Sequence, residues 1–186
     1  MDARRCGRLA ARTFLAGALV QAEIEELNPS IEALAEGDAE AFNADATFET
    51  YQAMVAKAIP SCDFESASVT AVDYAFEGVP ETLPAGTVAI DFTNASEGEE
   101  HEMIIFKKNE EGIYREAFLE ILSAEDEESE AVTFAGAAFA PPGGEGSALV
   151  ELEAGDYSMV CFIPVGGGED GPPHFTEGMI ADFSVQ

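Results

Sequence analysis

The sequence has no tryptophan, only two histidines and three cysteines, and eight basic residues among 186. Its 37 acidic residues give a formal net charge of −29 at pH 7. A surface this acidic repels the phosphates of nucleic acids and of anionic lipids, so we expect neither as a partner. It suits a cationic partner protein, or a high-salt environment in which self-repulsion is screened.

Long hydrophobic runs are also missing. The apolar run Phe14–Val20 is too short to cross a bilayer as a helix, and we expect no membrane span in the mature chain. Four arginines precede this run and Val20-Gln21-Ala22 follows it, a pattern typical of a secretory signal. We therefore interpret residues 1–22 as a signal peptide and expect an exported protein, periplasmic or extracellular. A disordered basic start or a misplaced start codon is the alternative.

Residues 23–64 form an acidic segment with helix signals. Asn28-Pro29-Ser30 is a suitable start for a short helix over Ile31–Glu36. Farther along, four apolar residues recur at helical spacing before Pro60 ends the pattern: Phe48, Tyr51, Val55 and Ala58. We interpret this segment as an acidic helical extension or tether.

From residue 65 onward the apolar pattern changes to a period of two, which is typical of strands. Strands are expected at Val69–Phe76, Thr87–Asn94, Met103–Phe106, Val132–Phe139, Ala148–Leu152, Tyr157–Ile163 and Met179–Val185. Residues 114–128 interrupt this pattern with one apolar helical face, so a helical insertion is expected there. Residues 65–186 are therefore predicted to be an all-β domain, a Greek-key antiparallel β-sandwich, and we expect a monomer.

The scarce histidines and one cysteine stand near the ends of these strands. His101 precedes Met103–Phe106, Cys161 lies near the end of its strand, and His174 occupies the next loop, five positions before Met179. Hairpin geometry would bring Cys161, His174 and Met179 to one end of the sandwich, and His101 would supply a fourth group. A thiolate and two imidazoles with a weak axial thioether suit copper in both oxidation states. The pattern predicts one mononuclear copper ion.

Each of these residues also has an ordinary interpretation. A lone buried cysteine is usually a small hydrophobe, and a disulfide between Cys62 and Cys161 would occupy the thiolate. Cys6 would leave with the signal peptide. The acidic run Glu125–Glu130 lacks the spaced ligands and central glycine of a calcium loop. The joint order His, Cys, His, Met favours copper over these alternatives.

The same residues resemble a known family. Phe92–Ser96 together with His101–Phe106 resembles the first copper-ligand region of plastocyanin-like cupredoxins, the blue copper proteins. Gly155-Asp156-Tyr157 through Cys161, then Pro173-His174 and Gly178-Met179, is similar to their closing ligand loop. The resemblance covers about residues 66–186 without the insertion. It implies a cupredoxin-like fold, with His101, Cys161 and His174 as equatorial copper ligands and Met179 as the axial one.

Two positions depart from the family pattern. Twelve residues separate Cys161 from His174, more than in small cupredoxins, and this length would leave His174 loosely held. Glu102 stands where the family often places an asparagine that helps to hold the cysteine loop. Its charge would favour Cu(II) and lower the reduction potential.

The function that these residues predict is one-electron transfer. His174, on a solvent-facing loop, would be the exit route, and an apolar patch of Pro172, Pro173 and Phe175 would dock a redox partner. Storage or delivery of copper is the first alternative, and a metal-free interaction module is the second. We expect no enzymatic activity, because two histidines cannot build the additional histidine-rich centre of copper oxidases or reductases.

Overall fold

The computed structural model describes residues 25–26, 29, 45–61, 64–109, 118–119, 130–168 and 171–186. The predicted signal peptide and the predicted helix Ile31–Glu36 lie outside the described residues. So does most of the predicted insertion, of which the described pair Phe118 and Leu119 is helical. Among the described helices, none is long and apolar enough to cross a membrane.

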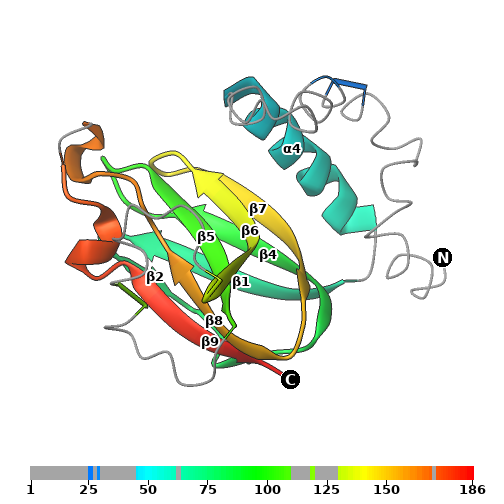
Figure 1. The fold of residues 1–186 in the computed structure, drawn as a ribbon. Helices are drawn as coiled ribbons and strands as arrows, with labels where there is room; N and C mark the ends of the chain where they lie inside the picture. The colour runs from blue at the N-terminus through cyan, green and yellow to red at the C-terminus, as the bar shows by residue number, and fades with distance from the viewer. Residues whose placement is uncertain are drawn as a thin grey trace.

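The described part of the chain is mainly a sandwich of two β-sheets (Figure 1). One sheet has the strand order β2-β1-β4-β7 and the other the order β3-β9-β8-β5-β6. The strands are β1 (Glu65–Val72), β2 (Ala75–Glu77), β3 (Thr82–Leu83), β4 (Gly86–Asn94), β5 (His101–Lys108), β6 (Val132–Ala140), β7 (Glu145–Leu152), β8 (Gly155–Val160) and β9 (Ile180–Val185). The predicted all-β sandwich is confirmed.

An antiparallel sandwich was expected, and the structure refines this: most strand pairs are antiparallel, but each sheet is mixed. β1 pairs in parallel with β4, and β3 pairs in parallel with β9. Parallel neighbours need a crossover between them. β2 and β3 lie between β1 and β4 in the chain, and β3 belongs to the opposite sheet. The chain crosses to that sheet and back, so that β4 pairs with β1 and runs in the same direction.

The single strand expected at Val69–Phe76 is divided in two. β1 ends at Val72, and β2 folds back on it in antiparallel register, with Val72 opposite Ala75. Asp73 has a positive φ of 39° at this reversal, a conformation that Asp tolerates in turns. The turn places Tyr74 at the end of the sandwich where the histidines lie.

The inter-sheet core follows the two-residue alternation of the strands. Tyr157 and Met159 on β8, and Met103 and Ile105 on β5, are buried in one cluster with side chains of the opposite sheet. A smaller cluster contains Phe118, Val160, Phe175 and Ile180. Cys161 lies two positions after Met159, and His101 lies two positions before Met103. Both therefore continue an inward-facing series, and they lie at the end of the core where the candidate site is.

Helix α4 (Asp45–Ala58) lies beside β7, the edge strand of its sheet (Figure 1). The Gln52 side-chain oxygen accepts a hydrogen bond of 3.0 Å from the backbone N–H of Ser147 on β7. Met54 and Val55 are buried. The helix predicted from the apolar spacing before Pro60 is confirmed, and it covers a strand edge that could otherwise pair with another chain.

The first prediction concerns the close approach of β6 and β7. A Cβ at Gly146 would clash with the backbone carbonyl oxygen of Phe139, which cannot move without disturbing the strand pairing. Gly146→Ala should therefore lower the free energy of unfolding by about 1–3 kcal/mol, measured by urea denaturation of the metal-free protein. Gly98→Ala, where a Cβ meets nothing within 4 Å, is the matched control and should cause no loss. Equal stability of the two variants would contradict the strand packing described.

Candidate metal centre

Three segments bring the predicted ligands to one end of the sandwich. His101 is the first residue of β5, and its side chain faces inward because it continues the series of Ile105 and Met103. Cys161 directly follows β8 and continues the inward series of that strand. His174 begins the 3-10 helix η4 (His174–Glu177). The three side chains come from separate segments, so their meeting depends on the fold.

The long loop between Cys161 and His174 is closed at its base by backbone pairing. His174 N–H donates to the Ile163 carbonyl oxygen at 2.9 Å, and Val165 N–H donates to that of Pro172 at 3.0 Å. Pro164 and Pro173 form an isolated antiparallel bridge between these two bonds. The loop residues beyond this pairing therefore project from a base that backbone hydrogen bonds hold closed, which we call the pinned base of the loop. The expectation that the length of this loop leaves His174 loosely held is not supported by these contacts.

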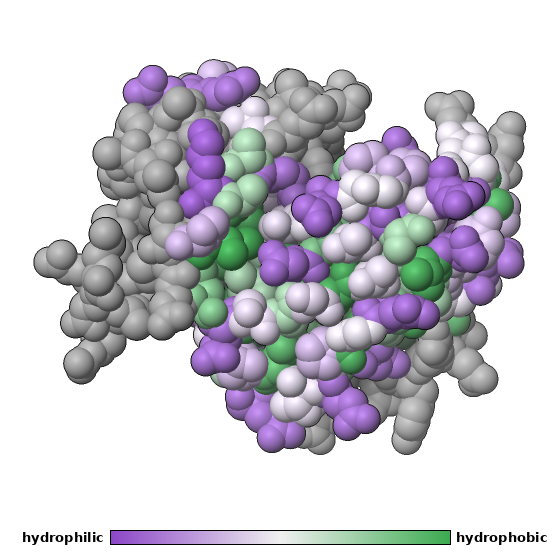
Figure 2. All heavy atoms as spheres, turned by 180° about the vertical axis from the view of Figure 1, so that it is seen from behind, coloured by the Kyte–Doolittle hydropathy of each residue, from purple (hydrophilic) through white to green (hydrophobic). Residues whose placement is uncertain are grey.

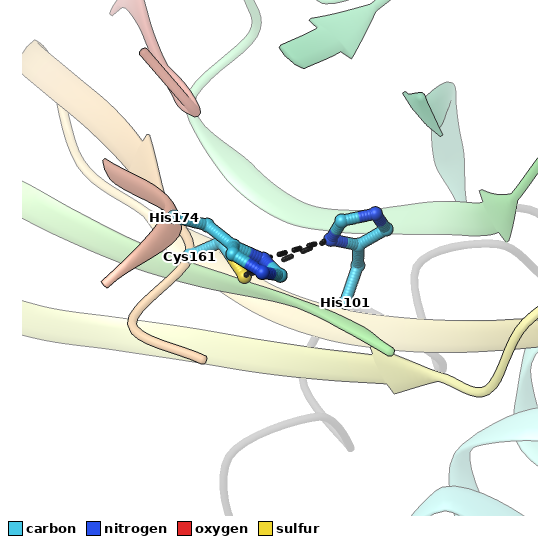
Figure 3. Close-up of side chains that lie close together, drawn as sticks. All are labelled: His101, Cys161 and His174. Atoms are coloured by element: carbon cyan, nitrogen blue, oxygen red, sulfur yellow. Dashed lines mark hydrogen bonds between the residues drawn. The ribbon is translucent and has the colours of Figure 1, made fainter. Parts of the chain in front are cut away.

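The donor atoms of His101, Cys161 and His174 converge (Figure 3). The two Nδ1 atoms are 3.2 Å apart, and Cys161 Sγ lies 3.4 Å from His174 Nδ1 and 4.0 Å from His101 Nδ1. All three residues have no exposed surface. Cys161 is a free cysteine, which excludes the alternative disulfide with Cys62 in this structure.

These separations fit a bound metal ion. Bonds of about 2.0 Å to nitrogen and about 2.3 Å to sulfur, at angles of about 120°, place two nitrogens about 3.5 Å apart and each nitrogen about 3.7 Å from the sulfur. The distances of 3.2, 3.4 and 4.0 Å each differ from these values by about 0.3 Å. The three side chains are therefore arranged for a trigonal site without rearrangement of the backbone.

Met179 lies beside these three residues. Its backbone N–H donates to the His174 carbonyl oxygen at 3.1 Å, and its own carbonyl oxygen accepts from Cys161 N–H at 3.3 Å. The Met179 side chain has no exposed surface and belongs to the same buried cluster as Cys161. Two imidazoles, one thiol and a neighbouring thioether form the donor set of a blue copper site.

Burial determines the protonation states of the centre. It lowers the pKa of His101 to about 4, helped by repulsion from His174 and opposed by the charges of Glu99 and Asp73. It also lowers the pKa of His174, against an opposing effect of Glu99. The pKa of Cys161 is raised to about 11 by burial, although N–H groups of Glu102 and Ile163 oppose this shift. At neutral pH both imidazoles are neutral and able to bind a metal, whereas the thiol must first lose its proton.

The prediction of a solvent-facing His174 was wrong. Its side chain has no exposed surface, and Phe175, part of the expected docking patch, is 4% exposed. The Tyr74 ring covers His174 with a centroid separation of 5.0 Å. Tyr74 follows the turn at Asp73, which the sequence pattern had merged into a single strand.

Glu102 connects β5 to the cysteine segment, as its position suggests. Its backbone N–H lies 3.5 Å from Cys161 Sγ, and its side-chain Oε1 accepts a hydrogen bond of 2.9 Å from Phe162 N–H. Burial raises the pKa of the Glu102 carboxyl group, and the Phe162 N–H opposes this rise. The Glu102 side chain thus links β5 to the backbone of the cysteine segment.

Three contributors to the site were missed by sequence reasoning: Tyr74, Asn94 and Glu99. Asn94 is fully buried; its amide donates to the Glu99 and Ala140 carbonyl oxygens, and its oxygen accepts from Ser96 N–H at 2.9 Å. This last bond, two residues along, is an Asx turn, for which Asn94-Ala95-Ser96 was an available signal. The turn fixes the approach of the chain to His101.

The comparisons with known proteins give structural likeness only. No protein-family model matches the chain, and no curated protein does. Auracyanin A of Chloroflexus aurantiacus, described as a "blue" copper protein, is 18% identical over 67% of this chain and 100% of its own, with a TM-score of 0.45. The reduced auracyanin of Roseiflexus castenholzii is 16% identical over 65% and 96%, with a TM-score of 0.42. Rusticyanin of Thiobacillus ferrooxidans is 20% identical over 67% and 80%, with a TM-score of 0.40. At this distance, the geometry of the centre itself has to support the function.

The second prediction concerns the reactivity of Cys161. In a Cys6→Ser, Cys62→Ser background, iodoacetamide should alkylate the folded metal-free protein at least about a hundredfold more slowly than the protein in urea. With a pKa of about 11, only about one thiol in a thousand is ionised at pH 8, and the group is buried. The extent of labelling is measured by mass spectrometry over time. Equal rates in both states would contradict the buried, protonated thiol.

Proposed function

We propose that this protein is a cupredoxin-type electron carrier that binds one copper ion through His101, Cys161, His174 and Met179. The observation that carries the proposal is the convergence of two imidazole nitrogens and one thiol sulfur within 4.8 Å of one another in a buried site. Soft sulfur ligands favour Cu(I), and imidazole suits both oxidation states, so this donor set supports a reversible couple.

Copper, when bound, supplies one-electron chemistry between its two oxidation states. Cys161 supplies a thiolate, and the two neutral imidazoles supply Nδ1 donors on the facing side. The hydrogen-bonded base of the loop holds Cys161 and His174 at a fixed separation. Ligands that cannot move far give both oxidation states similar geometry, so little reorganisation accompanies electron transfer. Burial of all three side chains excludes water from the donor atoms.

Neither histidine is exposed, so the electron would enter and leave the centre on the side where Tyr74 lies. Tyr74 is half-buried and lies against His174. Burial is the main cause of the raised pKa of the Tyr74 hydroxyl. The charges of Glu99, Glu177 and Asp73 lie close enough to raise it further. An acidic rim of this kind attracts a cationic redox partner and speeds its association.

The wider surface is consistent with a soluble carrier. The face in Figure 2 shows hydrophilic side chains spread among smaller hydrophobic patches. The net charge of −29 opposes self-association, which fits a monomer. Arginines followed by a short apolar run at residues 1–22 support export to the periplasm or the extracellular space, where the partner would be met.

Storage or delivery of copper requires a site that opens easily. The pinned loop base and the burial of His174 favour a retained ion instead. Copper oxidase or reductase activity would need a second, substrate-accessible copper, and both histidines of the chain already belong to this centre.

The third prediction tests copper binding. One equivalent of Cu(II) added to the reduced, folded protein should produce an intense visible band from charge transfer between the Cys161 thiolate and copper, recorded by absorption spectroscopy. Cys161→Ser should abolish the band because an alcohol does not replace the thiolate. Circular dichroism controls for folding of the variant. A colourless wild-type protein with intact structure would reject the carrier and favour the metal-free module.

The fourth prediction concerns Met179. Met179→Leu should keep the visible band, since the three equatorial donors remain, and should raise the reduction potential, because loss of the axial thioether removes electron density that favours Cu(II). Protein-film voltammetry measures the potential. Met159→Leu, the same change in the same buried cluster, is the matched control. Identical potentials for wild type and both variants would exclude Met179 as a ligand.

A further inference from the structure

Glu99 lies where four segments of the chain meet. Both of its carboxylate oxygens accept from the Gly166 N–H at 3.2 Å, in the glycine-rich part of the ligand loop. Burial raises the pKa of the Tyr74 hydroxyl, and the nearby Glu99 carboxylate raises it further. Its Oε2 lies 3.6 Å from His174 Nε2. One side chain thus accepts a hydrogen bond from the loop after Cys161, lies beside a candidate ligand and acts electrostatically on the turn after β1.

Glu99 is itself held firmly. Its backbone carbonyl oxygen accepts from Asn94 Nδ2 at 2.8 Å and from Ser96 Oγ at 2.6 Å. Only 25% of its side chain is exposed. The neighbouring Glu97 and Glu100 are exposed, so the orientation of Glu99 is not shared by the acidic residues around it.

The two nitrogens of His174 have different surroundings. Nδ1 faces Cys161 and His101, whereas Nε2 faces Glu99 and has no other polar partner among the described residues. His101 Nε2 also lacks a hydrogen-bond partner there. A carboxylate on the far nitrogen of a ligating histidine fixes the orientation of the ring and increases its basicity. Among the described residues, a carboxylate lies beside the Nε2 atom of His174, and none lies at that distance from the Nε2 atom of His101.

The loop contact has a separate role. Gly166 and Gly167 have positive φ values of 78° and 65°, so this part of the loop uses residues with many accessible conformations. Gly167 N–H donates to the Pro164 carbonyl oxygen within the loop, whereas Gly166 N–H donates to Glu99. The carboxylate therefore joins this glycine-rich part of the loop to the segment that carries His101.

We propose that Glu99 is a positioning residue that holds His174 in its ligating orientation and latches the glycine-rich loop, so that it lowers the reduction potential and slows loss of copper. This inference rests on the proposed copper site. The negative charge next to His174 favours Cu(II) over Cu(I), which sets the sign of the potential change. The hydrogen bond to Gly166 keeps the loop closed over the centre.

The two roles are separated by two substitutions. Glu99→Gln removes the charge but keeps an oxygen that accepts from Gly166, whereas Glu99→Ala removes both. Voltammetry should show a raised potential in both variants. Competition with a copper chelator should show binding weakened about 10- to 100-fold in Glu99→Ala and much less in Glu99→Gln. Glu100→Gln, with the same charge change at an exposed neighbour, is the control and should shift the potential far less.

Equal potential shifts in Glu99→Gln and Glu100→Gln would overturn the positioning role, because the effect would then be one of general charge. Unchanged copper affinity in Glu99→Ala would overturn the latch.

A metal-free measurement separates failure of this inference from failure of the copper site. Hydrogen exchange of the Gly166 amide, followed by NMR in the metal-free protein, should be faster in Glu99→Ala than in wild type or Glu99→Gln. Copper uptake by wild type with equal exchange in all three would overturn the latch and leave the carrier intact. No uptake would reject the copper site and with it the effect on potential, while faster exchange in Glu99→Ala would still support the loop contact.

Discussion

The arrangement of the centre depends on three backbone hydrogen bonds that join its segments. Phe175 N–H donates to the Cys161 carbonyl oxygen at 2.9 Å, Cys161 N–H to that of Met179 at 3.3 Å, and Met179 N–H to that of His174 at 3.1 Å. They connect the end of β8, the helix η4 and the start of β9 into a closed unit. Gly178, with φ of 117°, makes the tight return from η4 possible. The backbone alone therefore brings the side chains of Cys161, His174 and Met179 to one place.

Closure of this unit has an energetic consequence. Two imidazoles are buried with their Nε2 atoms lacking hydrogen bonds, and unsatisfied buried polar groups cost stability. Binding of a metal at the opposite nitrogens would stabilise the folded state, by an amount that grows with the logarithm of its affinity. The sandwich core and the α4 contact supply stability elsewhere, so the centre can keep polar groups that an ordinary core would replace by apolar ones.

The sequence predicted the parts of this structure that depend on local pattern or on scarcity. Alternating apolar residues located the longer strands but neither the short β3 nor the break between β1 and β2. Helical spacing before Pro60 located α4, and the presence of only two histidines singled out His101 and His174. The sequence did not predict how segments far apart in the chain pack against one another. The turn at Asp73 interrupts a continuous apolar alternation, so the cover of Tyr74 over His174 had no periodic signal. The pinned base of the loop depends on pairing across residues 164 and 173, which loop composition does not reveal.

The most direct test of the account is a crystal structure of the copper-loaded protein, with anomalous scattering recorded at the copper absorption edge. The account predicts one strong peak bonded to both Nδ1 atoms at about 2.0 Å and to Cys161 Sγ at about 2.3 Å. It also predicts ligand positions within about 0.5 Å of those described for the metal-free side chains. Copper bound only at acidic surface groups, or a centre whose loop must refold to bind it, would contradict the account.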